Sequence, residues 1–325
     1  YWQLLNNEQL DLPATGKYTP KKPDQYRIVG KRTQRIDLSG KIKGGAPFIQ
    51  DTSGVYHARI VRPPILSWTL KSIDTNKLSA EVDLVIDGNF IGIIAATESL
   101  AISAKQVLEK NTTWNKGNTE PVWDDLRTYL RNNAEFSLLV EDGTPTGTPI
   151  PELLKAPGKT IKASYSKPYH LHGSIAPSAA FAELRPDGKL VILSHSQGPS
   201  ILRQAIANVL DMDANRIDVT HRENAGCYGH NGADDAAMDA ALLSFHRPNI
   251  PILLKWHRHD EHQWEPFSPA TVIDMSATVS GGKIQCWNAD IFSQSHSGRP
   301  SAQDNTSNLI AAWQKSNPLP RPKAS

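Results

Sequence analysis

Short apolar runs and one amphipathic pattern follow one another between residues 41 and 115. Val82–Ile86 and Phe90–Ala95 are apolar and are joined through Asp87-Gly88-Asn89, which predicts a β-hairpin. Glu98–Glu109 has apolar residues at helical spacing on one face, which predicts a helix. With the alternating run Val55–Val61, these elements indicate a compact α+β unit over residues 41–115.

A second unit, over residues 161–325, mixes strands and helices. Helices are predicted at Ile201–Leu210, with Ser200 as the N-cap, and at Ala233–Phe245. Pro186-Asp187-Gly188 predicts a hairpin turn. Strands are predicted at Ile161–Tyr165, Ala179–Leu184, Leu190–Ser194, Ile217–His221, Ile252–Trp256, Val272–Val279 and Ile284–Asp290. The fold class is therefore α+β, with a mixed α/β second unit.

The remaining segments have the amino-acid composition of connectors. Residues 1–40 are irregular and rich in proline and lysine, which predicts an exposed lead-in. Residues 116–160 are rich in Asn, Thr, Gly and Pro, and we expect a connector with one short helix at Asp124–Arg131. The chain begins with Tyr1-Trp2 and ends in a proline-rich tail, so we expect a fragment of a longer polypeptide or one piece of a split subunit.

Composition narrows the classes of function. The 325 residues, 39% of them hydrophobic, are enough for two domains with buried cores. The net charge of +2 is small and dispersed, which argues against nucleic acid as a partner. No apolar run has transmembrane length. The two cysteines form no iron–sulfur ligand set or disulfide framework, and the compartment stays open between cytoplasm and periplasm, with membrane association through partners as a further option.

A glycine-rich segment, Gly226-Cys227-Tyr228-Gly229-His230-Asn231-Gly232, lies between the strand run Arg216–His221 and the helical run from Ala233. A strand, a glycine-rich turn and a helix start present unpaired N–H groups to an anion. The spacing matches neither a P-loop nor a dinucleotide fingerprint. The segment is therefore either a cradle for an oxyanionic cofactor or only a tight connection; Cys227 as a nucleophile is a minor option, because no His–Asp relay lies near it in sequence.

Ser194-His195-Ser196-Gln197-Gly198 closes a strand just before a helix. The Gln197 amide offers a donor and an acceptor, as a metal–oxo group or a cofactor amide requires. The alternative is that Ser196 and Gln197 only cap the helix.

Histidines cluster in two places. His257, His259 and His262 stand close together, and two histidines two apart on a strand share a face, so a zinc-dependent hydrolase is one hypothesis; a polar strand end at the surface is the other. His170 and His172 lie in a loop, where hydrogen bonding is their ordinary role.

The order of these segments resembles the molybdenum hydroxylases, the xanthine dehydrogenase and aldehyde oxidase family, and within it the molybdopterin-binding subunits of the nicotinate dehydrogenase and isoquinoline 1-oxidoreductase type. The residues that carry the resemblance are Tyr26-Arg27-Ile28-Val29-Gly30-Lys31, Arg35-Ile36-Asp37, Lys41-Ile42-Lys43-Gly44, Phe48-Ile49-Gln50-Asp51, Tyr56–Pro64, Ser194–Gly198, Gly226–Asp235, Trp264-Glu265-Pro266 and His296–Pro300. By this resemblance residues 41–115 are an α/β hammerhead domain and residues 161–325 part of a molybdopterin-binding domain. Gln197, Gly226, Cys227, Tyr228, Gly229 and Gly232 are the implied cofactor contacts.

The resemblance also implies an activity and partners. The family hydroxylates an N-heteroaromatic or aldehyde carbon with oxygen from water, at a molybdopterin cofactor for which the cytosine dinucleotide form is one option. The molybdenum is held by the pterin, so no protein metal ligand is required. Electrons leave through an iron–sulfur (2Fe-2S) partner subunit, and further molybdopterin-binding segments complete the site around a small-molecule substrate.

The chain departs from the family pattern at the catalytic base. The family's base glutamate lies in a Gly-Val-Gly-Glu segment that is absent here, so we expect no catalytic residue in this chain. Ala176 stands where the family often has an acidic residue. We expect a piece that is inactive alone; a non-catalytic structural subunit of a molybdoenzyme is the remaining alternative.

Overall fold

A computed structural model describes residues 13, 15–45, 48–117, 125–134, 139–141, 144–146, 154–294, 298–300 and 305–322. The chain divides into two compact units, Tyr1–Ala46 and Pro47–Ser325. In the first unit, η1 (Pro23–Gln25) and α1 (Leu38–Ile42) bury no side chain. Asp37 pairs there with Arg35 and with Lys41, at 2.5 and 2.6 Å.

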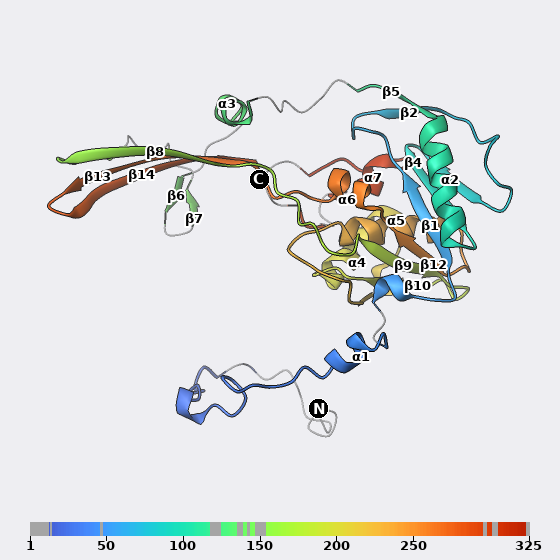
Figure 1. Cartoon of the computed structure of the whole chain (residues 1–325), viewed down its shortest axis with the longest axis horizontal. Helices are drawn as coiled ribbons and strands as arrows, with labels where there is room; N and C mark the ends of the chain where they lie inside the picture. Colours follow the sequence, from blue (N-terminus) through green and yellow to red (C-terminus); the bar gives the residue numbers. More distant parts are fainter. Residues whose placement is uncertain are drawn as a thin grey trace. The chain divides into compact units, whose positions relative to one another are not determined.

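A seven-stranded sheet organises the second unit, in the order β11-β10-β9-β12-β1-β4-β3 (Figure 1). Its strands are β1 (Tyr56–Val61), β3 (Asp83–Asp87), β4 (Phe90–Ala95), β9 (Ala179–Leu184), β10 (Leu190–Ser194), β11 (Ile217–His221) and β12 (Ile252–Lys255). β1 pairs with β12 and β10 with β11 in parallel, and the other neighbours are antiparallel. One sheet therefore combines strands from residues 41–115 with strands from residues 161–325, and the domain boundaries stay a prediction.

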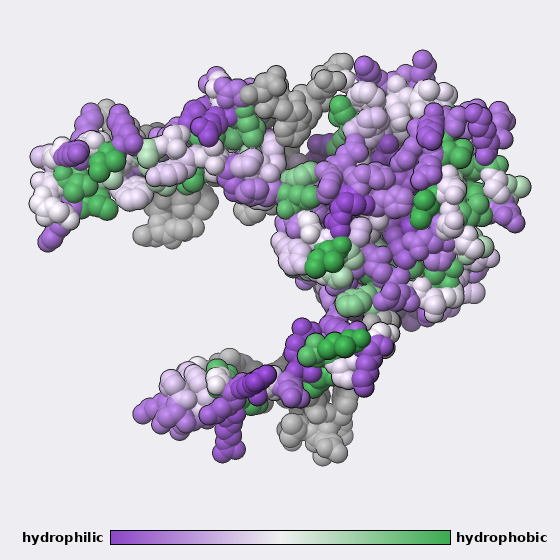
Figure 2. Space-filling view, viewed as in Figure 1, coloured by the Kyte–Doolittle hydropathy of each residue, from purple (hydrophilic) through white to green (hydrophobic). Residues whose placement is uncertain are grey.

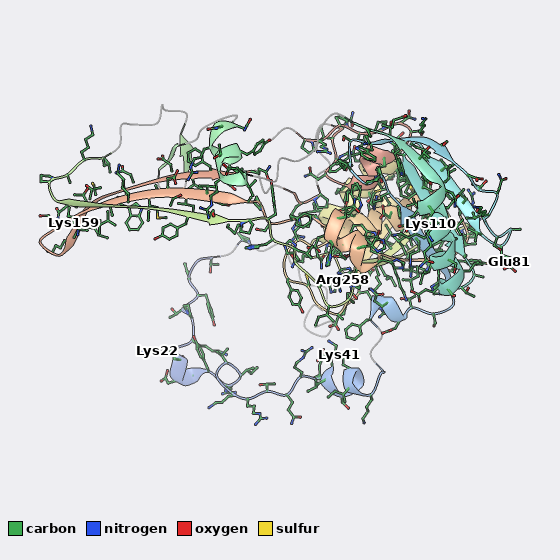
Figure 3. All side chains as sticks on the ribbon, turned by 45° about the horizontal axis from the view of Figure 1, so that its top comes forward. Lys22, Lys41, Glu81, Lys110, Lys159 and Arg258 are labelled. Atoms are coloured by element: carbon green, nitrogen blue, oxygen red, sulfur yellow. The ribbon has the colours of Figure 1, made fainter. Side chains whose placement is uncertain are left out.

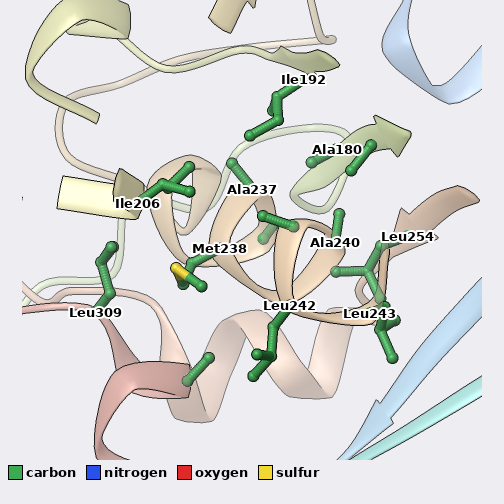
Figure 4. Close-up of a cluster of buried hydrophobic side chains, with 14 of the residues drawn as sticks. Ala180, Ile192, Ile206, Ala237, Met238, Ala240, Leu242, Leu243, Leu254 and Leu309 are labelled. Carbon is green, nitrogen blue, oxygen red and sulfur yellow. The ribbon is translucent and has the colours of Figure 1, made fainter. Parts of the chain in front are cut away.

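Helix α5 (Ala233–His246) is the centre of the main core, with Ala233 to Ser244 all buried. It packs against β9, β10, β12, α4 (Pro199–Leu210) and α7 (Ile310–Gln314), and Figure 4 shows Ala237, Ala240 and Leu243 among their neighbours from these elements. Small alanine side chains let the neighbouring backbones approach closely. Gly92 of β4 serves the same purpose, because a Cβ there would overlap Leu243 Cδ2. Full burial of a leucine such as Leu243 contributes about 2 kcal/mol.

Helix α2 (Glu98–Asn111) covers β1 and β4 over a second core that includes Ile91, Ile93 and Leu108. Thr97 is its N-cap and accepts a hydrogen bond from Leu100 N at 3.3 Å. The sequence patterns missed β2 (Thr69–Ile73) and β5 (Thr112–Asn115), which pair as a separate ribbon. Both have largely polar sequences without a clear alternation, so no hydrophobic pattern marked them.

A separate three-stranded antiparallel sheet has the order β14-β13-β8. Its strands are β8 (Lys159–Lys167), β13 (Thr271–Ser280) and β14 (Lys283–Ser293). α3 (Leu126–Asn132) packs against β13 and β14, with Leu130 beside Val272. The remaining elements are η2 (Ile49–Asp51), β6 (Leu139–Glu141), β7 (Thr144–Thr146), η3 (Ala214–Arg216) and α6 (Arg258–Trp264).

The α+β class is confirmed, and most predicted elements lie within two residues of their expected ends. α4 begins at Pro199, with Gly198 as its N-cap in place of Ser200. Proline is tolerated there because the first helical N–H has no partner within the helix. Within the described ranges, no helix is both long and apolar enough to cross a bilayer.

Candidate functional site

The two predicted cofactor segments meet at one edge of the central sheet. Gln197 follows β10 and Cys227 follows β11, and these strands are parallel neighbours whose carboxyl ends share an edge. Gln197 Nε2 donates a hydrogen bond to Cys227 Sγ at 3.1 Å, across 30 residues of sequence. Both residues were predicted to contact one cofactor, and the fold brings their side chains together.

In the turn before α4, Ser196 supports the start of the helix and Gln197 does not. Ser196 Oγ accepts a hydrogen bond from Gly198 N at 3.0 Å, so Ser196 supports the turn. Gln197 is exposed and makes no capping contact within its own helix. His195, by contrast, is buried, and that burial lowers its pKa to about 4, so its imidazole is neutral at physiological pH.

Each glycine of the loop has a physical reason. Gly226 and Gly229 have φ values of +105° and +118°, a region that side chains disfavour. A Cβ on Gly229 would also lie 2.8 Å from the His172 ring, and one on Gly232 would lie 2.5 Å from Trp256 Cζ3. Gly232 is thus explained by close packing, whereas Gly226 and Gly229 are required by the backbone path.

The loop leaves a run of backbone donors without partners among the described residues. Gly226 N donates to Asn224 O and Asn231 N donates to Gly229 O, at 2.9 and 3.1 Å. Between them, no hydrogen bond to another described residue engages the N–H groups of residues 227–230. Cys227 and Tyr228 are exposed. Successive free amides in a glycine turn suit an anionic ligand, so the residues present fit an oxyanionic cofactor.

Arg299 links the two segments, although sequence analysis assigned it no individual role. Its Nη2 donates to Gln197 Oε1, and its Nη1 lies 3.6 Å from Asp234 Oδ2. Asp234 is buried in the first turn of α5, and His230 Nε2 lies 3.3 Å from the same oxygen. A carboxylate is favourable at a helix N-terminus. Arg299 therefore fixes the Gln197 amide and adds positive charge beside the loop.

Two buried glutamates lie behind the loop. Glu261 Oε1 accepts a hydrogen bond from Ser178 N at 2.5 Å. Glu265 Oε1 accepts from His172 N and lies 3.3 Å from His172 Nδ1, which holds that ring against Gly229. Burial, together with the hydrogen bond to Glu265, raises the pKa of Glu261 to about 7, and burial lowers the pKa of His172. The two glutamates thus anchor the backbone of residues 172–178 at both ends, at His172 N and at Ser178 N.

The carboxylate pair was not predicted, because the secondary structure predicted for the histidine-rich segment was wrong. The prediction that His257 and His259 share a strand face is wrong: β12 ends at Lys255, and Arg258–Trp264 is helix α6 with His257 as its N-cap. In a helix, residues four apart face the same side, so the spacing of Glu261 and Glu265 was the available signal.

The histidine cluster differs from the predicted zinc set. Donor atoms of His257, His259 and Asp260 lie within 4.8 Å of one another, and His262 does not belong to this group. Lys105 Nζ donates to both Asp260 oxygens at 2.6 Å, and Arg59 Nε donates to His257 Nε2 at 3.3 Å. The cations thus engage donor atoms of Asp260 and His257 that a metal would need. Against the effect of burial, the charge and the hydrogen bonds of Lys105 lower the pKa of Asp260. Nothing in this geometry favours the zinc hydrolase.

Comparison with known proteins decides the family. The model of the molybdopterin cofactor-binding domain matches residues 143–309, just over half of the chain. The chain belongs to that family. The family range contains Gln197, the glycine loop, both glutamates and Arg299. It excludes residues 41–115, for which the hammerhead assignment stays a prediction.

The relatives of this molybdopterin-binding chain are much longer than the chain itself. It is 30% identical over 292 residues to a nicotinate dehydrogenase subunit of Pseudomonas putida; the match covers 86% of this chain and 24% of that protein. The chain therefore spans about a quarter of the length of that curated relative.

Two solved structures share the fold of this family member. The first is the aldehyde oxidoreductase of Desulfovibrio gigas, with a TM-score of 0.61 and 16% identity; the match covers 79% of this chain and 33% of that one. The second is quinoline 2-oxidoreductase of Pseudomonas putida 86, with a TM-score of 0.61 and 13% identity; the match covers 81% of this chain and 39% of that one.

Proposed function

We propose that this chain is part of a molybdopterin-dependent oxidoreductase that hydroxylates an N-heteroaromatic or aldehyde carbon with oxygen derived from water. The observation that carries the proposal is the meeting of Gln197 with Cys227 beside the free amides of residues 227–230, inside the range of the family match. The relatives named for nicotinate, quinoline and aldehyde support the substrate class.

We assign the cofactor contacts to six residues. Gly226 and Gly229 let the backbone approach the cofactor, and Gly232 leads into α5. The amides of Cys227 and Tyr228 donate hydrogen bonds to it, and Gln197 offers its side-chain amide, oriented by Arg299. When bound, the cofactor supplies a metal that activates the oxygen nucleophile and accepts the electrons. The general base is a glutamate outside this chain.

The proposal extends to the assembly. The Pseudomonas putida relative is named as one subunit of nicotinate dehydrogenase. We propose that a partner subunit with a 2Fe-2S cluster accepts the electrons from this chain's cofactor. We take the cytosine dinucleotide as the form of the cofactor, a point that chromatography of the released nucleotide checks directly.

Metal content of an assembled complex tests the function. The chain is expressed with the nicotinate dehydrogenase subunit of Pseudomonas putida from which the matching segment has been deleted, hereafter the complementing polypeptide. We expect about one molybdenum per complex by elemental analysis and much less in the isolated chain. A wild-type complex without molybdenum refutes the function, one with stoichiometric zinc in its place supports the hydrolase, and stoichiometric molybdenum in the isolated chain refutes the need for further segments.

A charge change at Cys227 tests the site itself. Because Cys227 is exposed, neither Cys227→Asp nor Cys227→Ala should unfold the chain. The added carboxylate repels an anionic cofactor, so Cys227→Asp should lose at least nine-tenths of the molybdenum, whereas Cys227→Ala should retain most of it. Ser200→Asp, on an exposed position of α4, is the charge control. Equal molybdenum in all four proteins would place the cofactor elsewhere.

A further inference from the structure

The three-stranded sheet has two faces of different chemistry. The register aligns Tyr165 with Ile273 and Ile291, and Ile161 with Ala277 and Trp287. Alternate residues of a strand share a face, so these rows lie on one side of the sheet. The residues of this side, hereafter the apolar face, are Ile161, Ala163, Tyr165, Ile273, Met275, Ala277, Trp287, Ala289 and Ile291.

The opposite face already has partners within the chain. Arg131 of α3 forms an ion pair with Asp274 at 2.8 Å, and Leu130 packs beside Val272. Leu154 N donates a hydrogen bond to Asn288 Oδ1 at 2.8 Å. Val272, Asp274 and Asn288, all at even-numbered positions of β13 and β14, are thus engaged by described residues.

The apolar face is exposed. Ile161, Tyr165, Trp287 and Ile291 are 54, 59, 52 and 65% exposed. None of the nine residues belongs to a hydrophobic cluster in the described part of the chain. Figure 2 shows apolar atoms at the surface of this sheet, and Figure 3 shows side chains projecting from its ribbon near Lys159. Large apolar side chains gathered on one exposed face are typical of an interaction site.

The size of the apolar face and the lysines on one of its edge strands indicate how a partner can bind there. Three rows on three strands form a flat patch of roughly 250 Å². That is well below the ~800 Å² each partner buries in a standard interface, so the face is the apolar centre of a larger contact. The outer strand β8 carries Lys159, Lys162 and Lys167, and edge lysines discourage the addition of another strand. The partner therefore packs on the face and not along the β8 edge.

We propose that the apolar face docks the part of the molybdopterin-binding subunit that lies outside this chain; this rests on the proposed function. The sheet lies within the family match at residues 143–309, while the chain spans only 24% of the curated relative and 33% of the D. gigas structure. Most of the polypeptide that accompanies this domain in its relatives is therefore absent here. None of the nine residues is charged, so the occupant presents a complementary layer of apolar side chains.

Paired variants on adjacent residues test the docking. The test variant is Tyr165→Lys/Ile291→Lys on the apolar face, and the control is Ser166→Lys/Asp290→Lys on the same two strands but the opposite face. All four positions are exposed, so both variants should fold, which circular dichroism and thermal melting check. Affinity for the complementing polypeptide is measured by titration calorimetry without added molybdenum. We expect the test variant to bind at least tenfold more weakly than wild type and the control to bind within threefold of it.

The possible results separate docking from cofactor binding and from other occupants. Docking without molybdenum in the complex leaves the interface standing and removes the proposed function. No binding by wild type, or equal binding by both variants, overturns the docking proposal. If the isolated chain dimerises in sedimentation and only the test variant loses the dimer, the docking proposal is overturned in favour of a second copy of this chain. If the chain binds phosphatidylglycerol vesicles and only the test variant loses that binding, it is overturned in favour of a lipid surface.

Discussion

Replacing Glu261 by glutamine should change how stability depends on pH. Glu261 is fully buried, accepts from Ser178 N, and lies next to Glu265. Glutamine keeps the acceptor oxygen and imitates the protonated carboxyl, because it is neutral and carries donors at the other atom. The substitution therefore removes only the titration.

The magnitude follows from the raised pKa. In the folded chain the pKa of Glu261 is about 7, against an ordinary value of 4.5. The folded state holds this proton more tightly than the unfolded state, so the stabilisation is complete below pH 4.5 and is lost as the pH rises through 7. At 1.36 kcal/mol per pKa unit, the loss is about 3 kcal/mol by pH 8. Glu261→Gln should exceed the free energy of unfolding of wild type by less than about 1 kcal/mol at pH 5 and by up to about 3 kcal/mol at pH 8.

Urea denaturation followed by tryptophan fluorescence at pH 5, 6, 7 and 8 measures this difference. Burial likewise raises the pKa of Asp235, to about 8, so the readout is the difference between variants at each pH. Glu98→Gln is the control of opposite sign: despite its burial, hydrogen bonds from Lys255 and Arg59 lower the pKa of Glu98, so its stabilisation is present above pH 4.5 and is lost in acid. A constant difference between Glu261→Gln and wild type from pH 5 to 8 would refute the raised pKa of Glu261.

Two further substitutions test the loop and the core. Gly229→Ala should lower the free energy of unfolding by about 1–3 kcal/mol in urea titrations, because Gly229 has a positive φ and its new Cβ would contact His172. Gly173→Ala is the control: Gly173 also has a positive φ, but no atom lies within 4 Å of its new Cβ, so the loss should be about 1 kcal/mol. Equal losses in the two variants would contradict the close approach of Gly229 to His172. Arg62→Met leaves the buried Asp239 without its ion-pair partner and should lower the free energy of unfolding by about 3–5 kcal/mol at pH 8. The loss should be smaller at pH 5, where Asp239 can take up a proton because burial raises its pKa. Adding Asp239→Asn should restore most of the lost stability, and a double variant no more stable than Arg62→Met would argue against an uncompensated charge.

Local patterns predicted what local interactions decide. The strands at Ala179–Leu184 and Leu190–Ser194 have their predicted bounds because apolar runs and a Pro-Asp-Gly turn mark them. The joining of β1 to β12 was beyond such reasoning, since it depends on packing between distant segments. In the candidate site, residue type and position singled out Gln197 and the glycine loop, whose role as cofactor contacts stays a prediction. Arg299 and Glu265 act through contacts across 93 or more residues of sequence, which local patterns do not show. The helix at residues 258–264 was missed because the run of charged and histidine residues lacks a clear apolar stripe.

The parallel pairing of β1 with β12 has a consequence for synthesis on the ribosome. β1 leaves the ribosome roughly 200 residues before its partner, which at ~5–20 residues per second amounts to about 10–40 s. During that time the small core under α2 can form, but β1 presents an open edge that can recruit a strand from another nascent chain. The central sheet is completed only when Ile252–Lys255 arrives, which makes folding slow and dependent on distant contacts. We therefore expect slower translation of residues 96–251 to lengthen the time in which this edge is open to other chains.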